Sequence, residues 1–200
     1  MMKKYIKVAC LLLLSGSLAG CSQAGANGPN NSGASQPSSG SAATSNAIQY
    51  AFTRAHQQPD KLLESVMDST NQSLDIACYS LTEKGIVNSI VSAKQRGVKV
   101  RLITDRDSTH NKSQAAAIHK ILAAGIPVKE NNHKGLMHLK ITIADSKTLT
   151  TGSFNYTNAA SQYNDEVLMV VHDTSLAKQW DDEFDAMWND TANYEDVRVR

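Results

Sequence analysis

From residue 48 onward, the spacing of apolar residues changes period several times. Up to residue 131, short apolar runs typical of strands alternate with segments whose apolar residues recur every three or four positions, as they do along a helix. Between residues 138 and 171, strand-like runs follow one another with no helical segment between them. Strands alternating with helices favour parallel pairing, and consecutive strands favour antiparallel pairing. The pattern therefore predicts an α/β domain with a mixed parallel and antiparallel β-sheet flanked by helices.

Capping residues set the ends of several elements. Pro59 and Asp60 open one helix, while Thr82 with Glu83 caps the next, which stops at Gly97. We expect strands at 48–53, 73–81, 98–105, 126–131, 138–144, 148–153 and 163–171, and helices at 59–69, 85–96, 113–124 and 174–189. The last helix turns one apolar face toward the core: Leu176, Trp180, Phe184, Met187 and Trp188.

The N-terminus has the layout of a secretory signal peptide. Lysines at positions 3, 4 and 7 precede an apolar run at 8–14 that is too short to span a bilayer as a resident helix. The following Leu18-Ala19-Gly20-Cys21 resembles the lipobox of bacterial lipoproteins, whose cysteine is acylated and becomes the first residue after cleavage. An ordinary cleavage site beside a cysteine is the alternative. We expect residues 1–20 to be a lipoprotein signal peptide and Cys21 to be the lipidation site.

Residues 21–46 differ in composition from everything that follows. After Cys21 they consist almost wholly of Ser, Gly, Ala, Asn, Gln and Pro, and they carry no charge. Such a segment buries too little apolar surface to offset its ordering entropy, so we expect a flexible tether with a reach of roughly 25–30 Å. The expected catalytic domain then covers residues 47–190, and residues 191–200 form a C-terminal tail.

Charge and cysteine content narrow the classes of function. The chain has 20 basic and 19 acidic residues, and removal of residues 1–20 takes away three lysines and leaves 17 basic against 19 acidic. Nucleic-acid binding would therefore depend on a local basic patch and not on a basic domain. Cys78 is the one cysteine of the expected domain, and its apolar neighbours indicate a buried small hydrophobic residue. No Cys and His array suited to a structural zinc is found in the sequence.

The segment at 138–155 combines a strand pattern with closely spaced polar residues. Alternation places His138 and Lys140 on one face of a strand. A two-residue turn at 145–146 would return the chain antiparallel and pair Lys140 with Thr151. This hairpin brings four polar side chains together at one end: His138, Lys140, Ser153 and Asn155.

These four side chains suit a phosphate group. Lysine, hydroxyl and amide groups donate hydrogen bonds to non-bridging phosphate oxygens, and a histidine among them attacks phosphorus or transfers a proton. Carboxylates are too sparse nearby for a glycosidase pair or a magnesium site. Gly152 is interpreted as a position where the backbone approaches a ligand. We therefore expect neither a metal nor a cofactor.

The spacing H-x-K, four residues, D, six residues, G-S-x-N resembles the HKD signature of the phospholipase D superfamily. The downstream segment 153–171 is also similar to the single-motif branch of that superfamily, which includes a bacterial endonuclease and a mitochondrial relative. The resemblance covers roughly residues 48–190 and is strongest over 133–171. All six motif positions are matched: His138, Lys140, Asp145, Gly152, Ser153 and Asn155.

The resemblance implies a phospholipase D-like single domain and a role for each matched residue. His138 is the nucleophile that forms a phosphohistidine, a second HKD histidine protonates the leaving oxygen, and no metal is needed. Glu166 lies where the family has a glutamate that orients a histidine, so His138, Lys140 and Glu166 form the catalytic set. Substrate phosphate is bound by Lys140, Ser153 and Asn155, and Asp145 and Gly152 are structural.

A second complete motif is missing from the chain. The other H-x-K is His110-Asn111-Lys112, but Ala117 occupies its aspartate position and no G-S-x-N follows, so we interpret it as a solvated loop or a helix start. The two-histidine mechanism needs two motifs. The single copy therefore predicts a homodimer in which two His138 side chains face each other across a two-fold axis and share one active site.

Several other polar residues have both a functional and an ordinary interpretation. His133 is spaced like a metal-ligand partner of His138, but a loop histidine is the simpler interpretation. Lys129 and Lys134 either add positive charge at the site entrance or belong to a solvated surface. His56 is a candidate for substrate contact. The remaining positions are interpreted as structural or exposed: His119, His172 and a salt-bridged loop at 105–107.

Three functions fit these observations. The leading hypothesis is a metal-independent phosphodiesterase that acts on nucleic acid as an endonuclease. The alternative is a phospholipase D that acts on membrane phospholipid, although the sequence shows no lysine-rich amphipathic helix or exposed aromatic cluster for insertion. An inactive nucleic-acid or lipid-binding module is the third. In each case Cys21 would anchor the domain to a membrane of the cell envelope on the extracytoplasmic side, and Ser22 resembles an outer-membrane sorting pattern.

Overall fold

The computed structural model describes residues 47–198, and the expected signal peptide, Cys21 and the tether lie outside these residues. Within the described part, strands alternate with helices up to residue 131, as the apolar pattern predicts, but a short helix at Asn158–Gln162 interrupts the consecutive strands predicted between residues 138 and 171. The strands are β1 (Ile48–Phe52), β2 (Ser73–Cys78), β3 (Lys99–Thr104), β4 (Val128–Asn131), β5 (Lys140–Ala144), β6 (Thr148–Gly152), β7 (Val167–Val171) and β8 (Tyr194–Asp196). The helices are α1 (Pro59–Ser69), α2 (Lys84–Gln95), α3 (Arg106–Thr109), α4 (Lys112–Ala123), α5 (Asn158–Gln162) and α6 (Thr174–Asn189).

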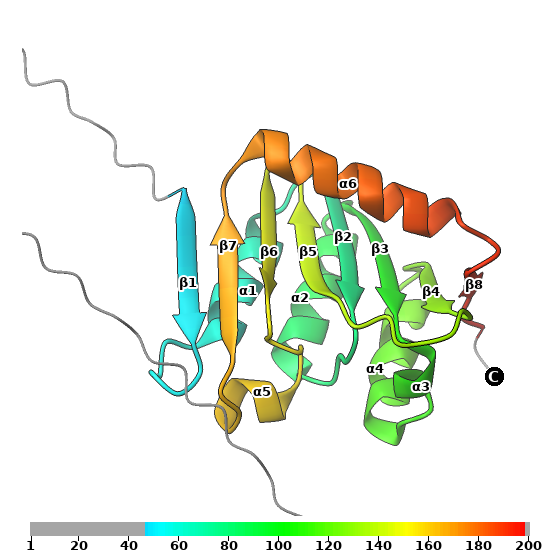
Figure 1. The fold of residues 1–200 in the computed structure, drawn as a ribbon, viewed down its shortest axis with the longest axis horizontal. Helices are drawn as coiled ribbons and strands as arrows, with labels where there is room; N and C mark the ends of the chain where they lie inside the picture. The colour runs from blue at the N-terminus through cyan, green and yellow to red at the C-terminus, as the bar shows by residue number, and fades with distance from the viewer. Residues whose placement is uncertain (1–46, 199–200) are drawn as a thin grey trace, which may run out of the picture. The chain divides into compact units, whose positions relative to one another are not determined.

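The eight strands form one mixed sheet in the order β1-β7-β6-β5-β2-β3-β4-β8 (Figure 1). The neighbours β2, β3 and β4 run parallel, and the other neighbouring pairs are antiparallel. Parallel neighbours need a crossover connection, which α2 supplies between β2 and β3, and α3 with α4 between β3 and β4. The prediction of a mixed α/β sheet flanked by helices is therefore confirmed.

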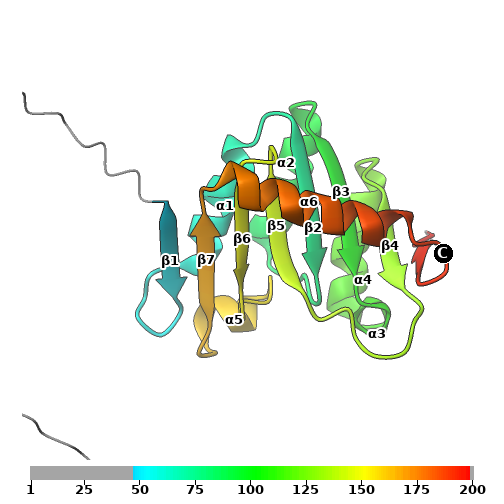
Figure 2. The ribbon, with the colours of Figure 1, turned by 45° about the horizontal axis from the view of Figure 1, so that its top comes forward.

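Helices cover the two faces of the sheet unequally (Figure 2). The larger core lies beneath α1, α2 and α4 on one face, and α6 crosses the other face over β6, β5 and β2. The expected apolar face of α6 is confirmed, because Phe184 is fully buried and Trp180 and Met187 pack beside it. None of the helices within residues 47–198 has the length and apolar character to cross a bilayer.

A largely buried ion pair within the sheet, Arg101 with Asp75, is joined by the half-exposed carboxylate of Asp185 on α6. Arg101 of β3 donates two hydrogen bonds of 2.7 Å to Asp75 of β2, and it pairs with Asp185 of α6 at 2.7 Å. Its guanidinium also lies over the rings of Phe184 and Trp188, 4.9 and 5.4 Å from the ring centres. Removing one partner from such a buried pair is costly because the other charge stays behind. Asp185 and the two aromatic rings thus connect α6 to this pair.

The β5–β6 hairpin has a different register from the predicted one. Ala144 pairs with Thr148 and Thr142 with Thr150, one residue away from the expected pairing, so the predicted two-residue turn is wrong. Asp145 and Ser146 both have left-handed backbone conformations, with φ of 54° and 52°. They and the residue after them form a longer turn, which the N–H of residue 147 closes by donating to the carbonyl of Ala144 at 3.0 Å.

The C-terminal segment contributes to the sheet. Residues 191–200 were expected to form a tail, but Tyr194–Asp196 form β8, which pairs antiparallel with β4. Tyr194 is buried against the cluster beneath α6. A strand of three residues is too short to produce a period in the sequence, which explains why the pattern missed it.

Candidate active site

The polar residues of the motif gather where several strands end. β5 begins at Lys140, which is the antiparallel partner of Cys78 at the end of β2. β6 ends at Gly152, and Ser153 and Asn155 follow directly. The start of β5 and the ends of β2 and β6 lie at the lower edge of the sheet in Figure 1. The topology therefore brings the predicted phosphate-binding residues to one edge.

The His138 ring is exposed to solvent and packed on one side against Tyr79. The two ring centres are 4.7 Å apart and the planes are tilted by 56°. Tyr79 follows β2 directly, and its N–H donates to the carbonyl of Leu139 at 2.8 Å. The end of β2 thus positions the imidazole without covering it. A histidine held in this way is available to an external ligand.

Lys140 is buried, in contrast to the neighbouring histidine. Its Nζ donates to the carbonyl of His138 at 2.8 Å and lies 5.1 Å from the centre of the Tyr79 ring. Burial lowers the pKa of Lys140, while electrostatic interactions with Cys78 and Glu166 act in the opposite direction. An ammonium has three N–H donors, and the contact to His138 uses one of them. The others suit the oxygens of a phosphate.

Asn155 lies in the chain between two fully buried aromatic residues, Phe154 and Tyr156. Its Oδ1 is buried and has no hydrogen-bond partner within residues 47–198. An unsatisfied buried polar atom costs free energy and is found more often at functional sites than in ordinary cores. Rotation of the amide exchanges oxygen for nitrogen and would direct its N–H groups toward a phosphate.

Ser153 and Glu166 line a second part of this edge. The Ser153 hydroxyl oxygen accepts a hydrogen bond of 3.2 Å from the N–H of Val167, and its own proton stays available for donation. Glu166 accepts from the Asn164 amide at 3.2 Å and not from His138. Both side chains line a cavity of about 320 Å³ together with Phe52. A second cavity of about 330 Å³ is lined by His138 and Lys140, so the motif residues line two separate cavities.

Gly152 has a structural role that differs from the expected approach to a ligand. Its φ is 142°, and a Cβ at this position would collide with the backbone carbonyl of Val167 on the neighbouring β7. The close approach that requires glycine is therefore between two strands, as suits the structural role that the resemblance implies for Gly152. Any side chain here would push β6 and β7 apart near Ser153.

Asp145 lies at the opposite end of the hairpin, in the turn. Its carboxylate accepts hydrogen bonds from the N–H groups of Asn71, Gln72 and Ser73, at 3.0, 2.7 and 3.0 Å. Its own N–H donates to the carbonyl of Ser73 at 2.9 Å. Burial acts to raise the pKa of Asp145, but the three N–H groups outweigh it and the pKa lies below its ordinary value. The geometry is that of a clamp between the turn and the start of β2.

Other histidines lie away from His138. His133 packs against Tyr194 with ring centres 5.6 Å apart, and its Nδ1 contacts the carbonyl of Lys134 at 2.8 Å. His56 is exposed in the loop after β1. Within residues 47–198, no three His, Cys, Asp or Glu side chains are grouped so as to hold a metal.

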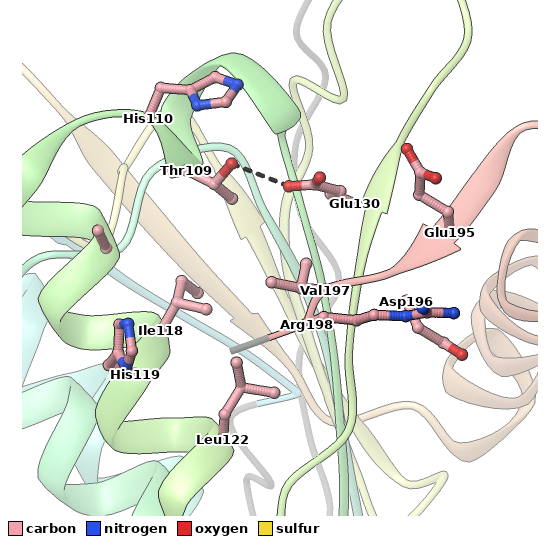
Figure 3. Close-up of a pocket in the computed structure, with 11 residues that line it drawn as sticks. Thr109, His110, Ile118, His119, Leu122, Glu130, Glu195, Asp196, Val197 and Arg198 are labelled. Carbon is pink, nitrogen blue, oxygen red and sulfur yellow. Dashed lines mark hydrogen bonds between the residues drawn. The ribbon is translucent and has the colours of Figure 1, made fainter. Parts of the chain in front are cut away.

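The second H-x-K lies in a different region. His110 follows α3 and lines the cavity of about 610 Å³ between α4, β4 and β8 (Figure 3). This cavity is larger than the two beside the motif, but its polar residues are mostly carboxylates and histidines. Thr109 donates to Glu130 across it at 2.8 Å. The predicted phosphate-binding residues therefore do not line this larger cavity.

Two residues that the sequence reasoning missed support the site. Tyr79 contacts both His138 and Lys140, and the position directly after an apolar strand was its one signal. Asp105 is 1% exposed and accepts from the N–H of Met137 at 2.8 Å, which holds the loop that leads to His138. Asp105 was interpreted as part of a salt-bridged loop, but it caps α3 and bonds backbone N–H groups instead. Cys78 is buried as expected, and burial raises its pKa to about 12.

A protein-family model described as "Cardiolipin synthase, PLD-like domain" matches residues 63–188. The chain belongs to the phospholipase D-like family. Its fold matches Nuc of Salmonella typhimurium, a phospholipase D family member, with a TM-score of 0.71 and 30% identity over 76% of this chain and 98% of Nuc. NucT of Helicobacter pylori matches with a TM-score of 0.66 and 28% identity over 70% of this chain and 94% of NucT.

Curated relatives of the phospholipase D-like chain carry lipid-related names. The mitochondrial cardiolipin hydrolase of Chlamydomonas reinhardtii is 33% identical over 62% of this chain and 54% of the relative. The phospholipase D of Rickettsia conorii is 32% identical over 60% of this chain and 59% of the relative. The chain thus spans a little over half the length of these relatives. The resemblance inferred from the HKD spacing is confirmed for family and fold.

Proposed function

We propose that this phospholipase D-like chain is a metal-independent phosphodiesterase that cleaves nucleic acid as an endonuclease. The observation that carries the proposal is that the exposed His138 ring and the buried ammonium of Lys140 both lie against Tyr79, with the ammonium bonded to the His138 carbonyl. A nucleophile must be reachable, and a group that stabilises developing charge is strongest where water is excluded. These two residues meet both conditions two positions apart in the chain.

The proposed reaction has two steps. An imidazole nitrogen of His138 attacks phosphorus, the bond from phosphorus to the leaving oxygen breaks, and an acid protonates that oxygen. Water then attacks the phosphohistidine, gives up a proton to the same group, and releases the phosphate product with His138 restored. Lys140, Ser153 and Asn155 hold the non-bridging oxygens in both steps. Glu166 orients a histidine, within one chain or across a dimer.

A homodimer would supply the acid. In this proposal, His138 of the partner subunit protonates the leaving oxygen, and the two copies share one phosphate site. Leu136 and Leu139 flank His138 and keep 49% and 41% of their surface exposed. Apolar side chains around a polar centre are what a protein interface covers. Sedimentation tests the pairing: a strictly monomeric chain with full activity contradicts it.

The choice of nucleic acid over lipid rests on the extent of the structural similarity. Nuc and NucT match over 98% and 94% of their length, whereas the cardiolipin hydrolase and phospholipase D relatives match over little more than half of theirs. The names of those relatives support phospholipid as the alternative substrate. An apolar lining beside His138, from Leu139, Trp180 and Met187, also favours this alternative.

One experiment separates these functions. The purified mature chain is incubated with plasmid DNA, RNA and phospholipid vesicles in separate reactions with chelator present. His138→Ala is the test variant, and His119→Ala on the exposed face of α4 is the matched control. DNA or RNA cleavage lost in the first variant and kept in the second supports the proposal. Headgroup release alone favours the phospholipase, and no turnover of any substrate favours a binding module.

We also propose that the domain is anchored in the cell envelope through acylated Cys21. The Leu18–Cys21 sequence supports this anchor. Two or more acyl chains on one residue give stable membrane attachment, unlike a single chain. Incorporation of labelled palmitate, absent in Cys21→Ser, tests the lipidation. Equal labelling of both forms contradicts it.

A further inference from the structure

β1 exposes a row of apolar side chains at one edge of the sheet. Ile48, Tyr50 and Phe52, here called the β1 strip, keep 54%, 60% and 46% of their surface exposed. The rings of Tyr50 and Phe52 pack edge to face, with centres 5.8 Å apart. No exposed aromatic cluster was expected from the sequence, and the β1 strip corrects that expectation.

The β1 strip extends the apolar face of the sheet beyond the part that α6 covers. Ala51, which points the other way, is buried on the side of α1. Val171 is the register partner of Ile48 and packs against the cluster beneath α6, so the strip shares the face that α6 covers elsewhere. In Figure 2, α6 crosses the middle of the sheet while β1 lies clear of it. The strip is therefore an apolar surface that the described chain leaves uncovered.

The opposite edge of the sheet is built in another way. β8 has three residues, and its Glu195 and Asp196 are exposed. Short, charged edge strands discourage association with other surfaces. β1 has five residues, none of them charged. An exposed apolar edge of this kind indicates a surface that another molecule or a membrane covers.

We propose that the β1 strip docks on the surface of a lipid bilayer. Chain order selects this occupant, because the tether that follows the predicted lipid anchor at Cys21 runs directly into β1. The strip is thus the first folded surface within the roughly 25–30 Å that the tether reaches. Aromatic side chains favour the membrane interface, where the ring is apolar and a tyrosine hydroxyl stays hydrated.

Docking through the β1 strip would orient the active site. Phe52, at the end of the strip, lines the cavity that also contains Ser153 and Glu166. Contact of the strip with lipid therefore fixes that cavity beside the bilayer. Because the strip has no Lys or Arg, the contact is hydrophobic and should depend little on salt or on anionic lipid. The proposal rests on acylation of Cys21 and holds for either phosphodiester substrate.

The test uses the mature acylated chain reconstituted in vesicles, after mass spectrometry of Cys21. A single fluorophore is placed at Tyr50→Cys or, as the matched control, at Glu195→Cys on the exposed edge of β8. The native Cys78 is fully buried, which protects it from labelling. Lipids with spin-labelled acyl chains quench a fluorophore that enters the bilayer. Vesicles of phosphatidylcholine are compared with vesicles that also contain phosphatidylglycerol, at low and high salt.

We expect quenching at position 50 to exceed quenching at position 195 by about 3-fold or more in both vesicle types. Phe52→Ser should reduce the quenching at position 50 with an unchanged circular dichroism spectrum. Equal quenching at both positions, or quenching lost at high salt, overturns the proposal. So does a Cys21 without acyl chains, or crosslinking of position 50 between two copies without lipid quenching. Cleavage of a soluble substrate is measured in parallel, so failure of docking and failure of the proposed activity are distinguished.

Discussion

The two ends of the β5–β6 hairpin carry residues of one motif, and they differ in what their polar groups contact. In the turn, Asp145 receives hydrogen bonds from three backbone N–H groups. At the other end, the His138 ring is exposed and the ammonium of Lys140 is desolvated. The Oδ1 atom of Asn155 there has no partner within the described residues.

This difference divides the motif into a stabilising end and a reactive end. Satisfied buried groups contribute to stability, whereas desolvated or unpaired groups reduce it and are kept where a ligand will complete them. Substitutions at the two ends should therefore have opposite signatures. Changes at the reactive end should abolish activity at little cost in stability, and changes in the turn should do the reverse.

The largest effect is expected for His138→Ala, which removes the proposed nucleophile. We expect phosphodiesterase activity to fall by roughly 10³-fold or more, because no other group can take the covalent step. The free energy of unfolding should change by about 1 kcal/mol or less, since the ring is exposed. Activity assays and urea denaturation of the same preparations measure both quantities. A loss of stability as large as that expected for substitutions in the turn would contradict the division of the motif into a stabilising end and a reactive end.

A smaller loss of activity is expected for Lys140→Met, by about 10²–10³-fold. Replacing a desolvated charge by an apolar chain of similar size should leave stability unchanged or increase it. Loss of activity together with equal or greater stability would be the clearest sign of a residue kept for function. A clear loss of stability in urea would instead assign Lys140 to the structural end.

The lowered pKa of Lys140 also predicts the pH dependence of activity. The ammonium form is the phosphate donor, so activity should decline as pH rises through a pKa below the ordinary value of about 10.4. Lys140→Arg keeps its charge across this range and should lose the alkaline decline, although its wider head lowers the rate. A pH–rate profile of both proteins checks this. If the arginine variant shows an identical decline, the loss of activity at alkaline pH is due to the titration of another group.

The opposite signature is expected for Asp145→Ala. Three N–H groups lose their acceptor and a left-handed position gains alanine, so the free energy of unfolding should drop by about 2–3 kcal/mol. Asp145→Asn, which tolerates the conformation and keeps one acceptor, should lose less. Activity at temperatures where both variants are folded should stay within a few-fold of wild type. A large loss of activity in the folded asparagine variant would show that the turn contributes to activity as well as to stability.

The pKa of Asp145 gives a matched prediction for acid stability. Because the folded pKa lies below the unfolded value of about 3.9, the ionised carboxylate stabilises the fold above that value. This contribution is lost as pH falls through the folded pKa. Wild type should therefore lose stability more steeply than Asp145→Asn below about pH 4. Parallel curves for the two proteins would mean that the clamp contributes nothing.

How far the sequence predicts these features depends on the range of the contacts involved. Local spacing was sufficient for the family, for the longer strands and helices, and for His138 two positions before Lys140, but it missed the short elements α3, α5 and β8. The register of the hairpin was not predictable, because Asp145 adopts its turn conformation while bound to residues 71–73, far away in the chain. Nor was the β1 strip, whose exposure depends on where α6 stops covering the sheet.

Tyr79 shows the same limit within the site itself, and it gives the smallest expected effect. Its ring contacts His138 and lies against the ammonium of Lys140, so it belongs to the reactive end although it is outside the motif. Loss of a cation–π contact and of ring packing in Tyr79→Leu should lower kcat by about 10-fold, with a smaller change in KM. Tyr79→Phe keeps the ring and should stay within about 2-fold of wild type.

The leucine variant should also move the alkaline decline in activity to lower pH, because an aromatic ring no longer favours the charged form of Lys140. If both variants lose activity equally, the hydroxyl and not the ring acts at the site. If the leucine variant loses stability but keeps the wild-type pH profile, Tyr79 belongs to the core and not to the reactive end.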